Sequence, residues 1–188
     1  MGQTFMYGLI NRAIQDMVCE RFGEETWSEI RERAGIKERI LLVLEPYPDE
    51  ITHKLVAVSS QVLNVSAREI MQLFGQYWIK YTGTAGYKEI MEMGGDSLQE
   101  FLQNLDDLHS RVGIQLPALT PPSFACKEVD GSTLEVHYSS KRKGLASMVI
   151  GLIEGLGEKF STDVKVTQVS RKDNGGEQDI FQIEYKAQ

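Results

Sequence analysis

The spacing of apolar residues divides the chain into a helical first part and a second part that contains strands. From Met6 to about Val112, apolar side chains recur every three or four positions, which is typical of amphipathic helices. The repeat is clear in Ile10, Ala13, Ile14, Met17 and Val18, and again in Ile70, Leu73, Phe74, Tyr77 and Trp78. Ser66 with Glu69 predicts a capping box for a helix that runs to about Tyr81, and Asp96 with Gln99 predicts one for a helix at 97–112.

The pattern changes after Gly113. The stretch IQLPALTPPSF carries three of the five prolines, which exclude a helix there. Leu134, Val136 and Tyr138 then alternate with polar residues as in a strand, the segment at about 145–160 returns to helical spacing, and strands at about 164–169 and 180–185 flank the turn DNGGEQ. We predict an α+β fold with an N-terminal helical lobe and a C-terminal antiparallel sheet of about four strands with a helix. A single domain over 1–188 is expected, with the helical lobe at about 6–65 and the remaining helices and sheet at about 66–185.

Composition limits the choice of partner and compartment. A chain of 188 residues with 41% hydrophobic content can bury one core, and its formal charge of -7 argues against nucleic acid or an anionic membrane surface as the partner. Two cysteines, far apart in sequence, are too few for a disulfide framework. The sequence shows no membrane-length apolar run and no signal peptide, so we expect a cytoplasmic protein with no membrane partner.

Among the three histidines, His109 is the one whose position suggests a functional role. It shares the apolar face of its helix, whereas His53 and His137 fall on polar sides of their elements. A histidine in that position is more often a hydrogen-bonded core residue than a metal ligand. It has no HExxH companion, no nearby cysteine and no carboxylate at ligand spacing on its face, so a zinc or di-iron site made by the protein alone lacks ligands. One interior histidine can still bind iron if a macrocycle supplies the other ligands.

A second group of residues stands in VHYSSKRKG at 136–144. Tyr138, Ser140 and Arg142 occupy every second position, so an extended strand would place these donors on one face over roughly 13 Å. An exposed strand face is the simplest interpretation. A haem nevertheless carries two carboxylates that such donors would satisfy, and bonds from Arg to carboxylate are among the strong ones.

Four segments together resemble the haem nitric oxide/oxygen-binding (H-NOX) family: MYGLINRAIQDMV, LDDLHSRVG, PPSFAC and YSSKR. The likeness runs from about Met6 to Tyr185. It implies haem b (iron protoporphyrin IX) held between the lobes, with His109 as the iron ligand. It also implies that Tyr138, Ser140 and Arg142 bind the propionates, and that Ile10 and Pro122 press on the porphyrin. Cys126 matches a cysteine in soluble guanylate cyclase, although by itself it is a small buried hydrophobe.

The resemblance implies a gas sensor and not an enzyme, since no polar group suited to peroxide chemistry is evident on the distal side. The helix after YSSKR has no tyrosine to donate to dioxygen, and Ser147 and Met148 stand near that position. Nitric oxide and carbon monoxide are therefore the expected ligands. Two alternatives remain: an oxygen sensor in which Trp78 donates, and a haem-free binder of an amphipathic carboxylate. Because no effector follows in this sequence, a separate partner is expected, a histidine kinase or a cyclic-di-GMP enzyme.

Overall fold

A computed structural model describes residues 5–37, 42–84, 87–116, 120–142, 144–172 and 178–187. The chain divides into two compact units, Met1–Phe74 and Gly75–Gln188. Within the described residues there are seven helices and two antiparallel sheets, so the predicted α+β class is confirmed. The division falls inside helix α4 (Ala67–Thr84).

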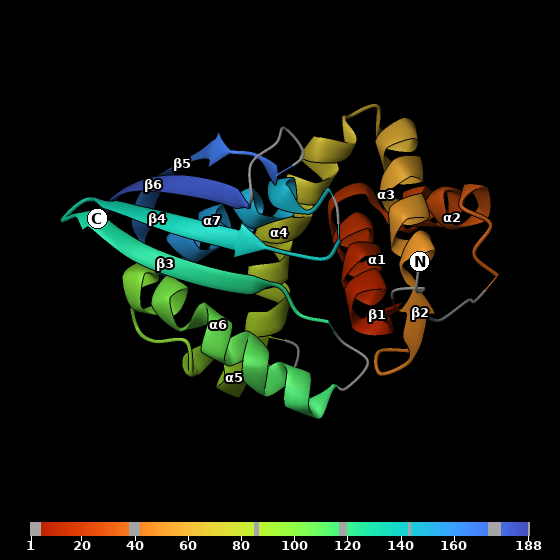
Figure 1. Cartoon of the computed structure of the whole chain (residues 1–188). Coiled ribbons are helices and arrows are strands. Elements are labelled where there is room, and N and C mark those ends of the chain that lie inside the picture. Colours follow the sequence, from red (N-terminus) through yellow and green to blue (C-terminus); the bar gives the residue numbers. More distant parts are fainter. Residues whose placement is uncertain are drawn as a thin grey trace. The chain divides into compact units, whose positions relative to one another are not determined.

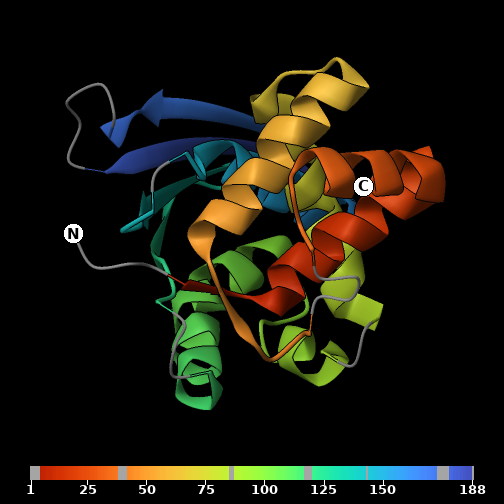
Figure 2. The same cartoon turned by 90° about the vertical axis from the view of Figure 1, so that its right-hand side faces the viewer.

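The first unit is built on three helices, α1 (Gly8–Phe22), α2 (Glu24–Arg33) and α3 (Asp49–Leu63), which pack against one another (Figures 1 and 2). Their periodic apolar residues are buried, including Ile14, Met17, Val18, Trp27, Ile30 and Leu55. The sequence prediction missed a short antiparallel pair, β1 (Phe5–Tyr7) and β2 (Pro46–Pro48). A strand reading PYP resembles a turn in sequence, and a two-stranded sheet tolerates proline because each strand has an open edge.

The second unit centres on a four-stranded antiparallel sheet in the order β3-β4-β6-β5. Its strands are β3 (Ser123–Asp130), β4 (Thr133–Ser139), β5 (Thr162–Ser170) and β6 (Asp179–Ala187). Helix α7 (Ala146–Lys159) packs against β5, and α6 (Leu98–Gln115) packs against β3, with α5 (Lys88–Glu92) beside α6 (Figure 1). The predicted alternation in β4 is confirmed, since Leu134, Val136 and Tyr138 are at most 3% exposed. Residues 173–177 of the predicted hairpin turn lie outside the described residues.

Helix caps match the sequence prediction at one helix and correct it at another. Ser66 Oγ accepts from Glu69 N at 3.2 Å while Glu69 Oε2 accepts from Ser66 N at 2.8 Å, so that capping box is confirmed. At α6 the predicted pair is wrong by one residue: Ser97 Oγ accepts from Glu100 N at 3.2 Å. Helix α6 also continues past 112 to Gln115, because the first proline of the following segment stands only at position 117.

No helix within the described ranges is long and apolar enough to cross a lipid bilayer.

Helices α4 and α7 come close together at Gly75. A methyl group added to Gly75 would lie 2.2 Å from the carbonyl oxygen of Met148, whereas one added to Gly83 in the same helix would meet nothing within 4 Å. We expect Gly75→Ala to lower the free energy of unfolding by about 1–3 kcal/mol because backbone must move to admit the methyl group. Gly83→Ala should instead raise it by up to about 1 kcal/mol. Urea denaturation of both variants measures this, and equal effects would contradict the close crossing.

Candidate functional site

His109 lies on α6, half-buried, with its two ring nitrogens in different surroundings. Nδ1 donates to the carbonyl of Leu105 at 2.8 Å, and because a carbonyl only accepts, this bond fixes the proton on Nδ1. Nε2 makes no hydrogen bond within the part of the chain that the structure describes. Burial lowers the pKa of His109, which favours the neutral imidazole. A neutral ring with one nitrogen anchored and the other unbonded is the form in which histidine binds a metal.

Phe124 links His109 to β4, and sequence reasoning missed it. Its ring stacks on that of His109, with centroids 5.3 Å apart and planes at 24°, and packs against Tyr138 at 5.1 Å. The backbone N–H of Phe124 donates to Asp106 Oδ1 at 2.8 Å, so β3 is fastened to α6 one turn before His109. The sequence feature that could have indicated its role is the apolar side chain of Phe124 in PPSFAC, just after the pair of prolines.

Tyr138, Ser140 and Arg142 are brought together, but not as a row on one strand. Strand β4 ends at Ser139, and Ser140 Oγ accepts from the backbone N–H of Arg142 at 3.1 Å, which bends the chain. The pairing of Ser123 with Ser139 would place Pro122 opposite Ser140, and proline cannot extend the ladder. The predicted extended row of roughly 13 Å is therefore wrong.

The bend gathers the three donors into a compact cluster. The side chains of Tyr138 and Ser140 share a hydrogen bond, and Arg142 Nη1 donates to the carbonyl of Thr120 at 2.7 Å. Burial raises the pKa of the Tyr138 hydroxyl, and the Asp179 carboxylate adds to the rise, whereas the Ser140 bond and the charge of Arg142 oppose it. Tyr138 thus remains protonated, and a half-buried guanidinium lies on the same bend.

The remaining predicted site residues fall into two groups. Pro122 immediately precedes β3 and is half-buried, and Trp78 on α4 is half-buried with its ring stacked on Tyr81 at 6.0 Å. Met148, also half-buried, is in the first turn of α7. Ile10 is in the first turn of α1 and belongs to the first unit, whereas the other residues belong to the second.

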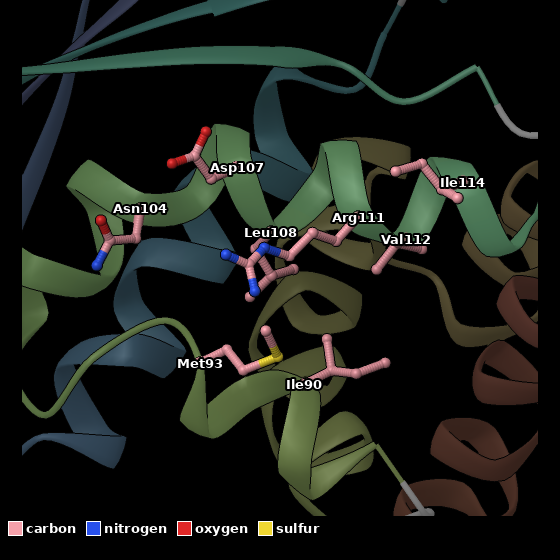
Figure 3. Close-up of a pocket in the computed structure, with 8 residues that line it drawn as sticks. All are labelled: Ile90, Met93, Asn104, Asp107, Leu108, Arg111, Val112 and Ile114. Carbon is pink, nitrogen blue, oxygen red and sulfur yellow. The ribbon is translucent and has the colours of Figure 1, made fainter.

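A cavity of about 380 Å³ lies elsewhere on α6, on the side that faces α5 (Figure 3). Ile90 and Met93 face Leu108, Arg111 and Val112 across it. None of the predicted site residues lines this cavity, so it is not the candidate site.

The residues present fit a haem. Among the described residues no group of three or more His, Cys, Asp or Glu side chains is placed to hold a metal ion, so no described cluster offers further ligands to a metal at His109 Nε2. A porphyrin supplies such ligands. The cluster of Tyr138, Ser140 and Arg142 offers the hydrogen-bond donors and positive charge that its carboxylates need.

Comparison with known proteins agrees with this fit. Residues 7–168 match the family described as Haem-NO-binding. The chain belongs to this family. Its H-NOX fold is also that of solved structures: an H-NOX protein from S. oneidensis in the Fe(II)NO ligation state, which is 20% identical, has a TM-score of 0.87 with 96% of this chain and 99% of that chain covered. A mutant H-NOX from T. tengcongensis is 25% identical with a TM-score of 0.83, covering 96% and 98%.

Curated relatives of this H-NOX chain are guanylate cyclases. Soluble guanylate cyclase gcy-32 of Caenorhabditis elegans is 33% identical over 183 residues, 92% of this chain and 26% of that protein. Guanylate cyclase soluble subunit beta-2 of Rattus norvegicus is 36% identical over 99 residues, 52% of this chain and 14% of that one. The chain spans about a quarter of the C. elegans relative, so cyclase activity is not carried over to it. What the family gives is a haem-binding domain of gas sensors.

The reactivity of the Cys126 thiol on β3 reports how far this side chain is shielded from solvent. Burial raises the pKa of its thiol to about 11, so at pH 8 the reactive thiolate should be about a hundredfold scarcer than in the unfolded chain. In a Cys19→Ser variant, which leaves only Cys126, we expect a disulfide reagent to label native protein about a hundredfold more slowly than urea-unfolded protein. Similar rates in the two states would show that Cys126 is open to solvent.

Proposed function

We propose that this H-NOX chain is a sensor that binds nitric oxide, and carbon monoxide, at ferrous haem b and signals to a separate effector protein. The observation that carries the proposal is the imidazole of His109, anchored through Nδ1 and unbonded at Nε2, beside a cluster of hydroxyl and guanidinium donors. When bound, haem would supply an iron that takes up a diatomic gas.

His109 holds the iron in this proposal, and its neighbours set the direction of that bond. The Leu105 carbonyl fixes the tautomer, which directs the Nε2 lone pair away from the helix backbone. The Phe124 ring, stacked at 24° to the imidazole, limits rotation of the ring. A change in the pull on His109 would pass to α6 and, through the bond between Asp106 and Phe124, to β3.

Tyr138, Ser140 and Arg142 bind the propionates in this proposal. The bond from Arg142 Nη1 to the Thr120 carbonyl anchors the guanidinium, and the bond from Arg142 N to Ser140 Oγ keeps the hydroxyl next to it. Anchored donors lose less conformational entropy on binding an anion. We assign to Ile10 and Pro122 the role of pressing on the porphyrin, and propose that one haem-binding domain spans both units.

The preference for nitric oxide and carbon monoxide rests on the residues of α7. No tyrosine occurs among Ala146–Lys159, and Ser147 and Met148 occupy its first turn. Dioxygen, which becomes polar when bound, depends on a hydrogen-bond donor much more than the other two gases do. Trp78 is the alternative donor, although its stacking on Tyr81 and its contacts with the core favour a packing role.

A histidine kinase or a cyclic-di-GMP enzyme is the proposed effector. The proposed location is the cytoplasm, where both kinds of enzyme signal. Its reducing conditions suit the two free cysteines, Cys19 and Cys126. Fractionation of cells that produce the protein checks that location.

The iron ligand is tested by His109→Gly. This variant should bind haem only when imidazole is added to occupy the space of the missing ring. Haem titration with and without imidazole, followed by absorption spectroscopy, measures this. His53→Gly, at an exposed position on α3, is the matched control and should bind like the unaltered protein. Unchanged histidine-bound haem in His109→Gly without imidazole would refute the assignment.

Gas selectivity is tested by exposing the reduced, haem-loaded protein to each gas. We expect spectral changes with nitric oxide and carbon monoxide and no stable complex in air, because a missing hydrogen bond of roughly 1 kcal/mol or more lowers affinity about fivefold or more. Replacing Ser147 or Met148 by Tyr should shift the protein toward dioxygen. Stable uptake of dioxygen by the unaltered protein, lost in Trp78→Phe, would instead establish the alternative oxygen sensor.

Signalling is tested with kinases and cyclic-di-GMP enzymes encoded beside the gene. Binding or activity of one of them should differ between gas-free and nitric-oxide-loaded protein, because a ligand shifts a partner only through a difference in affinity between states. The sensor proposal loses its support if none responds.

A further inference from the structure

A second cation reaches the bend that carries Ser140 and Arg142. Lys172 follows β5, and its ammonium donates to the carbonyl of Ser140 at 3.3 Å. The two residues are 32 positions apart in sequence, so this contact exists only because β5 and β6 fold back beside β4. Lys172 is exposed, and its amine therefore remains accessible to a further acceptor.

Asp179 holds the backbone of Lys172 in place. Its Oδ1 accepts from Lys172 N at 3.2 Å and from Gln168 Nε2 at 2.8 Å. Asp179 is the first residue of β6 and pairs with Tyr138 of β4, so the carboxylate stands next to the hydroxyl cluster. The charges of Arg142 and Asp179 thus act on the Tyr138 hydroxyl, and the Lys172 ammonium lies at Ser140 of the same bend.

We propose that Lys172 is a second anion-binding residue of the haem site, which together with Arg142 balances the two propionate carboxylates. The inference rests on the proposed function, and nothing in the sequence pattern around YSSKR pointed to it. Arg142 alone offers one charge to two carboxylates. Lys172 supplies the second from the neighbouring end of the β5–β6 pair, with its backbone held by Asp179 and its ammonium already at Ser140. A lysine suits this place because a flexible, rotatable donor can share its three N–H groups between the carbonyl and a carboxylate.

The test compares haem dissociation from Lys172→Met, Lys172→Arg and the unaltered chain, by transfer to excess apomyoglobin. Lys165→Met is the matched control: it removes the same charge from an exposed lysine of β5 whose ammonium pairs with Glu184 at 2.9 Å. Each protein is loaded with haem and, separately, with haem dimethyl ester, whose carboxyl groups carry no charge. Arg142→Ala serves as the reference for loss of the proposed main donor.

We expect Lys172→Met to release haem about two- to fivefold faster at low salt, as for a solvent-exposed charge pair, with the effect reduced in 1 M salt. Lys172→Arg should restore the rate, and Lys165→Met should not change it. With the dimethyl ester, Lys172→Met and the unaltered chain should release at equal rates.

Two outcomes would overturn the inference, and they are distinct from failure of the proposed function. If Arg142→Ala speeds release while Lys172→Met does not, the haem site stands and Lys172 has no part in it. If Lys172→Met speeds release of haem and of its ester by the same factor, the residue only stabilises the fold. Failure of the chain to bind haem at all, or no effect of Arg142→Ala, would instead refute the proposed propionate site itself.

Discussion

The hydrogen bond from His109 Nδ1 to the carbonyl of Leu105 is the constraint on which the candidate site depends. The acceptor is a backbone carbonyl of the preceding turn, so no second side chain is needed to hold the ring. The bond leaves Nε2 as the nitrogen that can bind a metal. Burial lowers the pKa of His109 and so favours the neutral imidazole, the form that can bind a metal. Nε2 is left without a hydrogen bond in the described part of the chain, and it is the nitrogen that the proposed iron bond would use.

In the second unit, a short series of contacts connects His109 to the sheet. Phe124 stacks on His109 and touches Tyr138, and Asp106 binds the backbone of Phe124, so α6, β3 and β4 meet around one ring. The bend after β4 then gathers Ser140 and Arg142 next to Tyr138. The proposed iron ligand and the proposed propionate-binding cluster are thereby connected by packed side chains, which gives a change at His109 a physical route to the sheet.

Much of this could be predicted from sequence because it depends on local pattern. Burial of Leu134, Val136 and Tyr138 follows from strand alternation, and the Ser66 capping box follows from residue spacing. The parts that could not be predicted depend on pairing between distant segments. Ser140 leaves the strand because Pro122 would stand opposite it, which requires the register of β3 on β4. Lys172 reaches Ser140 only once β5, β6 and β4 are ordered, and the stacking of Phe124 on His109 requires α6 to lie along β3.

The central claim is that a histidine of α6 is the protein ligand of a haem iron. Resonance Raman spectroscopy of the reduced, haem-loaded full chain tests it most directly, since an iron–histidine stretching band reports that bond alone. The account predicts saturation at one haem per chain and a band that shifts when histidine is labelled with ¹⁵N. Haem uptake that does not saturate at one per chain, or a reduced protein without a label-sensitive band, would contradict it.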